Sequence, residues 1–258
     1  MEMLRGRLNV YVFLVMCALV GLRAGAQVPS SQDQNANTES PQQFLEHELD
    51  RLNGLIADEP SRFHHERAEV LFRLGRFEES VRDYDVAARF GWPHDDNSCW
   101  ERGLAQYYAG DFHAGAEQFA RYHRVGALDI ENGLWRFLCI AEDEGLAKAR
   151  ETMFAYPRKL RTPFPALLAL YMDAGTADAV LEEANAETTS SEAHTESLFY
   201  AHYYLGKYYE IIDDNKNALI HINESLNHRI PHFMYACAEA DAKRMAIDRV
   251  PKTSNEEI

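Results

Sequence analysis

The chain has 258 residues, of which 46% are hydrophobic and 26% are charged, so it can bury a core and is neither wholly disordered nor collagen-like. Its 41 acidic side chains outnumber the 26 basic ones and give a formal net charge of -15. This balance lacks the basic footprint of nucleic-acid-binding proteins, so nucleic acid is not an expected partner.

Residues 1-26 have the pattern of a secretory signal peptide. Arg5 and Arg7 precede an apolar run over residues 8-22, and a small-residue pattern ends at Ala26, where we expect cleavage. The run is short for a membrane span, which needs roughly 17-25 residues. The sequence therefore predicts export to the periplasm or the medium, with no stable membrane span after cleavage. An uncleaved N-terminal anchor is the alternative.

Residues 27-41 contain almost nothing apolar and are predicted to be a flexible linker. From residue 42 onward, apolar residues recur at three- and four-residue spacing, and short Pro- or Gly-containing breaks separate the segments. We therefore predict an all-α domain over residues 42-250, followed by a disordered acidic tail over 251-258.

Three cysteines follow the predicted signal: Cys99, Cys139 and Cys237. An odd number in an exported chain cannot form a complete disulfide framework. We expect buried free thiols, and a single disulfide is the alternative.

The domain repeats itself at an interval of 35 residues. The interval superposes small residues on small ones and aromatic residues on aromatic ones: Ala68 on Gly103, Gly75 on Gly110, Phe77 on Phe112, Ser80 on Gly115, and Tyr84 on Phe119. Two antiparallel helices that cross closely need small residues at the contact, and the turn between them needs a residue that tolerates positive φ. The aromatic residues would fill the gaps within and between the helix pairs. This periodicity predicts stacked helix pairs.

The repeat resembles the tetratricopeptide repeat (TPR) family. The family's pattern of residues is clearest near the C-terminus, where Leu205, Gly206 and Tyr209 are followed by Ala218 and Ile222. The leading tryptophan of the family pattern is missing. The resemblance implies a right-handed α-solenoid of about five antiparallel helix pairs, with degenerate middle pairs near 129-157 and 163-185.

The C-terminal unit also resembles the NlpI-type TPR lipoproteins of bacterial envelopes. The resemblance is carried by Phe199-Tyr200, by the run 204-209, and by the sequence His232-Phe233-x-Tyr235. It implies an adaptor that docks envelope enzymes such as cell-wall hydrolases and proteases. The sequence has no lipobox, so membrane anchoring is not carried over from that group.

In TPR proteins the first helix of each pair lines a concave groove that binds a peptide or a partner protein. The resemblance implies the following groove residues: His65, Glu69, Arg73, Trp100, Tyr107, Trp135, Tyr203 and Lys207. Aromatic residues and Arg are typical binding anchors. Packing between repeats is the alternative role for the aromatic members of this set.

We therefore expect a non-enzymatic, exported interaction scaffold with no catalytic residues and no cofactor. No metal site is expected, because Pro231 breaks the helix that would place His228 and His232 together. The alternative function is a structural, self-assembling repeat module of the envelope, and a homodimer is compatible with either. A hydrolase within residues 125-195 is a third hypothesis.

Overall fold

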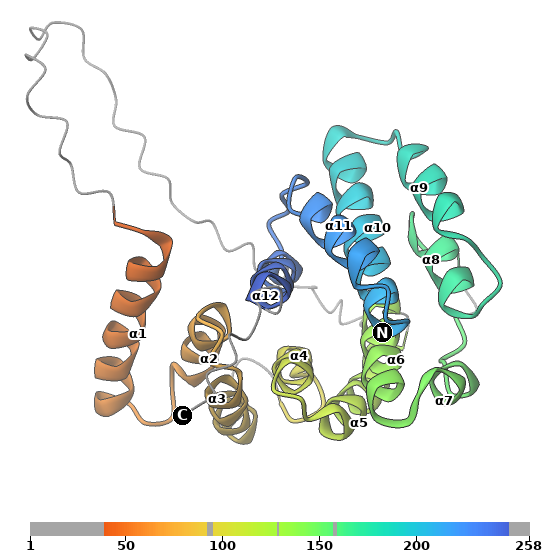
Figure 1. The fold of residues 1–258 in the computed structure, drawn as a ribbon. Coiled ribbons are helices and arrows are strands. Elements are labelled where there is room, and N and C mark those ends of the chain that lie inside the picture. Colours follow the sequence, from red (N-terminus) through yellow and green to blue (C-terminus); the bar gives the residue numbers. More distant parts are fainter. Residues whose placement is uncertain (1–38, 92–94, 128, 157–158, 248–258) are drawn as a thin grey trace, which may run out of the picture. The chain divides into compact units, whose positions relative to one another are not determined.

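The computed structural model describes residues 39-91, 95-127, 129-156 and 159-247. The predicted signal with its cleavage position at Ala26, most of the predicted linker and the predicted tail lie outside the described residues. Twelve helices occur in the described ranges (Figure 1). Their bounds are α1 (Pro41–Asp58), α2 (His64–Arg73), α3 (Phe77–Phe90), α4 (Trp100–Tyr108), α5 (Phe112–His123), α6 (Ile130–Glu144), α7 (Leu146–Glu151), α8 (Phe164–Tyr171), α9 (Ala177–Asn185), α10 (Ser191–Ile211), α11 (Asn215–Ser225) and α12 (Phe233–Ile247).

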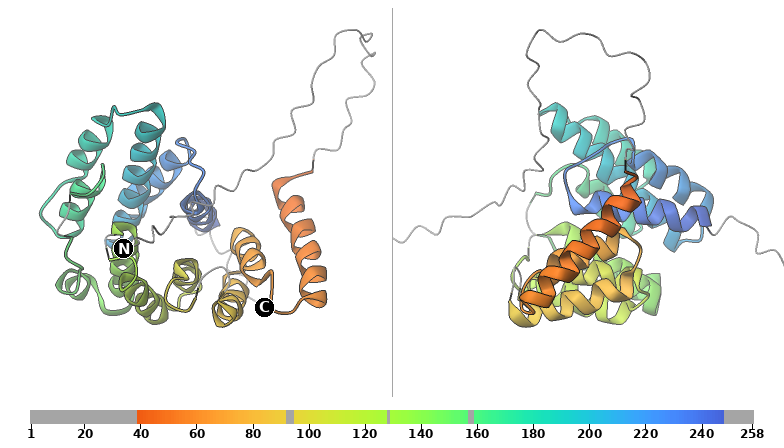
Figure 2. Two further views of the ribbon diagram at one scale, coloured as in Figure 1. Left: turned by 180° about the vertical axis from the view of Figure 1, so that it is seen from behind. Right: turned by 90° about the vertical axis from the view of Figure 1, so that its left-hand side faces the viewer.

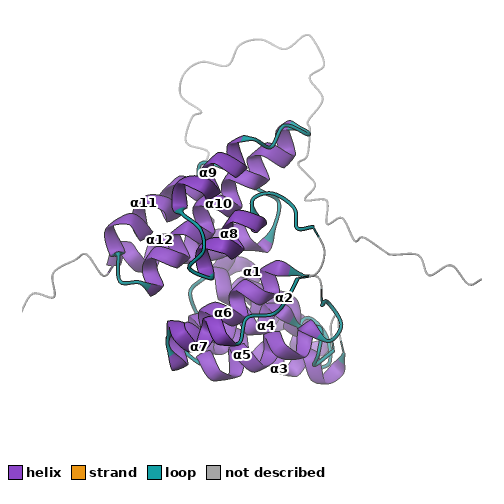
Figure 3. Ribbon diagram, turned by 90° about the vertical axis from the view of Figure 1, so that its right-hand side faces the viewer, coloured by secondary structure: helices purple, strands orange, loops and turns teal. Residues whose placement is uncertain are grey.

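Each helix packs mainly against its neighbours in the sequence. Contacts join the consecutive helices from α1 to α7 and from α8 to α12, and α10 also contacts α8 and α6. Helix α10 therefore lies between the α8–α9 pair and α11 (Figure 2). The described ranges contain no strand (Figure 3). The all-α prediction is confirmed, whereas pairing of the TPR type remains a prediction.

The first helix begins at a capping box. The Ser40 hydroxyl accepts a hydrogen bond from the Gln43 amide, and the Gln43 side chain accepts one from the Ser40 amide. Pro41 occupies the first turn, where its missing N–H leaves no bond unmade. The helical domain thus starts at Pro41, one residue before the predicted boundary.

The turn glycines and the small residues at helix crossings have the geometry that close helix pairs require. Gly75, Gly110 and Gly145 have φ of +78°, +79° and +91°, in the region that favours glycine. A Cβ on Gly103 would lie 2.8 Å from the Phe119 ring, and one on Gly115 would lie 2.9 Å from the Cys139 sulfur. Larger side chains at these crossings would force the helices apart.

The core consists of one large cluster and one small one. The large cluster runs from Ala68 on α2 to Ala238 on α12. The small cluster joins α1 to α2 through Leu49, Leu52 and Leu71. Helix α1 is therefore held to the rest of the described chain mainly through α2.

The three cysteines of the described ranges are buried free thiols, as the sequence predicts. Burial raises the pKa of the Cys99 thiol to about 12 and raises those of Cys139 and Cys237 further above the ordinary range. A thiol with so high a pKa remains protonated at neutral pH and is a poor nucleophile.

Candidate functional site

The last helix packs on side chains of α2 and α4, among them Trp100, which the sequence assigned to a groove. The Phe233 ring, at the start of α12, lies 4.9 Å from the ring of Phe72 on α2. The His232 ring, just before α12, is parallel to the indole of Trp100 at 5.9 Å. Farther along, the Tyr108 hydroxyl lies 3.0 Å from the carbonyl oxygen of Cys237. Helix α12 thus occupies space that the prediction left open.

The eight predicted groove residues differ in their exposure. His65, Tyr107, Trp135, Tyr203 and Lys207 are buried, and Tyr203 and Lys207 have no exposed surface. Glu69 and Trp100 are half-buried, and only Arg73 is exposed. The protein's own side chains therefore cover five of the eight residues, and partner binding by this set remains a prediction.

Lys207 is the centre of a buried ionic network that ties α10 to α12. Its ammonium lies 3.2 Å from an Asp241 oxygen and 2.5 Å from a Glu210 oxygen. Arg244 contacts both carboxylates, at 2.9 Å from Asp241. Burial alone would lower the pKa of Lys207, but Asp241 and Glu210 outweigh it and raise that pKa well above its ordinary value. Lys207 is therefore charged and holds α12 in place.

Tyrosine hydroxyls complete this network from α4 and α10. The Tyr108 hydroxyl donates to Asp241 Oδ2 at 2.7 Å, and the Tyr203 hydroxyl donates to the same oxygen at 3.3 Å. The Lys207 ammonium lies 4.8 Å from the centre of the Tyr107 ring, a cation–π distance. Two aromatic residues predicted to bind a partner, Tyr107 and Tyr203, instead join the helices of this chain.

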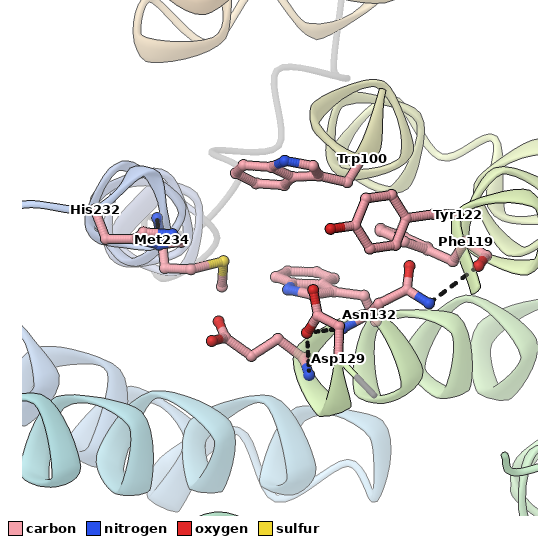
Figure 4. A pocket seen from close by; sticks show the side chains of 9 residues that line it. Trp100, Phe119, Tyr122, Asp129, Asn132, His232 and Met234 are labelled. Carbon is pink, nitrogen blue, oxygen red and sulfur yellow. Dashed lines mark hydrogen bonds between the residues drawn. The ribbon is translucent and has the colours of Figure 1, made fainter. Parts of the chain in front are cut away.

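A pocket of about 180 Å³ is formed where α4, α5 and α6 approach the start of α12. This volume is below the roughly 300-1,000 Å³ of sites that enclose drug-sized ligands, and it suits a single side chain. Figure 4 shows the Met234 side chain extending from α12 toward the pocket. The lining residues are Trp100, Phe119, Tyr122, Asp129, Glu131, Asn132, Trp135, His232 and Met234.

Two polar atoms in the pocket wall have no hydrogen-bond partner among the described residues. The Asn132 amide donates through Nδ2 to the carbonyl of Phe119 at 3.0 Å, which fixes its orientation (Figure 4) and leaves Oδ1 unpaired. The Nε1–H of Trp135 is also unpaired, and the residue as a whole is 2% exposed. A buried polar group without a partner costs about 1-3 kcal/mol. A ligand N–H donor that reached Asn132 Oδ1 would recover the part of this cost that is due to that atom.

Carboxylates give the pocket a partly acidic wall. Asp129 caps α6 by accepting hydrogen bonds from the amides of Glu131 and Asn132. Glu131 pairs with Arg161 at 2.6 Å, and its side chain is 18% exposed. Burial raises the pKa of Glu131 to about 7, and nearby Asp129 adds to the rise while Arg161 opposes it. Glu131 therefore exchanges a proton near neutral pH.

Sequence reasoning identified two of the nine pocket residues, Trp100 and Trp135. It missed Asn132, His232 and Met234 as site residues because the pocket exists only where α12 meets the α4–α6 region. The only signal was the His232-Phe233 pair, which contributed to the NlpI-type resemblance but carried no assigned role.

Neither a protein-family model nor a curated protein matches the sequence. Among the helices of the described ranges, none combines the length and the apolar character needed to cross a bilayer.

Proposed function

We propose that this protein is a non-enzymatic interaction module that receives one basic side chain of a partner segment in the pocket between α12 and α4–α6. The observation that carries the proposal is the unsatisfied acceptor Asn132 Oδ1 in a wall of aromatic rings and carboxylates. The module would be exported as its N-terminal sequence predicts and would act as an adaptor for other proteins.

Three features favour a basic side chain as the occupant. Trp100, Tyr122 and Trp135 offer aromatic faces, which attract cations. Asp129 adds negative charge, Glu131 adds more when it is ionised, and Asn132 Oδ1 is an acceptor without a partner among the described residues. The net charge of -15 favours the approach of a basic segment over distance.

The scaffold supports this role by rigidity. The pocket walls come from packed helices, and the Lys207–Asp241 network fixes α12 against α10. A preformed site loses little entropy on binding, so most of the ordering cost falls on the ligand. Stacked helix pairs of the TPR type, which the repeat spacing predicts, would extend the same rigidity along the domain.

A random-peptide display selection against the purified protein tests the proposal. We expect the recovered peptides to share an Arg or Lys at one position. Trp100→Ala should weaken their binding about tenfold or more, because central aromatic anchors dominate small interfaces. Phe90→Ala is the matched control, since Phe90 is a 58% exposed aromatic residue that does not line the pocket. Peptides without a common basic residue, or equal losses in both variants, would refute the proposal.

Light scattering on the same samples separates the self-assembly alternative. If the protein is an adaptor, peptide binding should increase the mass of the protein particle only by the mass of the peptide. A dimer that Trp100→Ala dissociates, and that excludes peptide, would instead assign the pocket region to self-association.

A further inference from the structure

A second group of side chains gathers on α10 and α11, apart from the pocket. His202 belongs to α10, Glu224 to α11, and His228 follows the end of α11. One ligand atom from each of the three can be chosen so that all lie within 4.8 Å of one another. All three are half-buried. The sequence analysis considered His228 only together with His232, because His202 meets Glu224 and His228 only once α10 and α11 have packed.

A third imidazole adjoins the group. His221 Nδ1 lies 3.0 Å from His202 Nδ1, so one ring must donate and the other accept if no ion is bound. Two nitrogens bound to one tetrahedral zinc ion at 2.0-2.1 Å would be about 3.3 Å apart, close to this separation. The Tyr209 ring stacks on His221 at 5.4 Å and limits its movement.

The remaining contacts within the group are longer than hydrogen bonds. His228 Nε2 lies 3.6 Å from Glu224 Oε1, beyond a normal hydrogen bond. The His202 and His228 rings are nearly parallel at 5.9 Å, with an interplanar angle of 14°. The possible ligand atoms of His228 and Glu224 are therefore close to each other but do not form a normal hydrogen bond.

We propose that His202, Glu224 and His228 bind a zinc ion, with His221 or water in the fourth position. Two imidazoles and one carboxylate are a ligand set that zinc accepts, whereas magnesium and calcium prefer oxygen ligands alone. Metal binding here would tie α10 to the segment between α11 and α12. Such a link would stabilise the C-terminal helices.

Titration of the EDTA-treated, full-length protein with Zn²⁺ in a calorimeter tests the site. We expect one equivalent to bind, and we expect His202→Ala and His228→Ala each to weaken binding about tenfold or more. His113→Ala is the matched control. His113 is exposed and lies 3.5 Å from Glu117 one turn away, but outside the His202 group.

Two further measurements keep the test decisive if His202→Ala fails to fold. Glu224→Gln, which keeps the shape of the side chain, should also weaken Zn²⁺ binding. Co²⁺ in place of Zn²⁺ should give the visible absorption of a tetrahedral ion, and this absorption should be lost in His228→Ala. Absence of Zn²⁺ binding, or equal binding by the His228→Ala and His113→Ala variants, would overturn the proposal.

Discussion

Lys207 and Asp241 form an ion pair between two side chains that have no exposed surface. Such a pair is costly to break from one side, because the remaining charge is left buried. Glu210, Arg244 and the Tyr108 hydroxyl share the same network. At the scale of single residues, the position of α12 therefore depends on ionic interactions between buried side chains.

Lys207→Met should lower the free energy of unfolding by about 3 kcal/mol or more, because Asp241 loses its buried partner. Urea unfolding followed by circular dichroism measures this change. Lys148→Met removes an exposed lysine paired with Glu151 one turn away and should change stability by less than about 1 kcal/mol. Similar effects of the two substitutions would contradict the proposed role of the network.

Glu131 should make stability depend on pH. Its folded pKa of about 7 lies above its ordinary value of 4.5. Between these values the folded state holds a proton that the unfolded state has lost, so this residue's contribution to stability falls as the pH rises. Arg161, Asp129, Tyr200 and His232 are the other titratable groups nearby.

Glu131→Gln removes this contribution. The stability of the wild type relative to the variant should therefore decline from about pH 5 to about pH 8, as measured by urea unfolding at each pH. A constant difference between the two proteins over this range would show that the Glu131 pKa is not raised.

At the scale of helices, α10 and α11 approach each other closely at Gly206. A Cβ there would lie 2.6 Å from the Ile222 side chain and 3.1 Å from the Ile222 backbone nitrogen. Side-chain rotation cannot relieve the second contact, so the helices would have to separate. Because Ala218 and Ile222 on α11 are buried, separation would disturb the core.

Gly206→Ala should therefore lower the midpoint of thermal unfolding and cost about 1-3 kcal/mol. The control is Gly54→Ala on α1, where an added Cβ meets nothing within 4 Å. There, alanine should stabilise the helix by up to about 1 kcal/mol. Stabilisation by both substitutions would contradict the close crossing.

The sequence predicts the local features of these helices well. Periodicity indicated the helices, the positive φ of Gly75 and Gly110 followed from the turn pattern, and the small residues at crossings followed from the 35-residue interval. These features depend on near neighbours in the chain.

The sequence could not place α12 against the rest of the domain. Asp241 meets Lys207 and Tyr108 across 34 and 133 residues, and no periodic pattern encodes such pairings. The pocket, the covered groove residues and the His202 group all result from long-range packing. They could therefore be found only in the folded chain.

At the scale of the whole molecule, the net charge of -15 should speed the association of a basic peptide. Salt shortens the Debye length from about 30 Å at 0.01 M to about 3 Å at 1 M. The association rate constant, measured by stopped-flow fluorescence, should therefore fall by about tenfold or more over this range. A rate constant that does not depend on salt would show that the charge does not steer the ligand.

The most direct test of the central claim compares two peptides that differ at one position. One carries arginine in a sequence recovered by display, and the other carries citrulline, which has a similar shape but no charge. We predict that calorimetric titration will show the arginine peptide to bind about tenfold or more tightly than the citrulline peptide. This preference should be lost in Trp100→Ala. Equal affinities for the two peptides in the wild-type protein would contradict the claim that the pocket recognises a basic side chain.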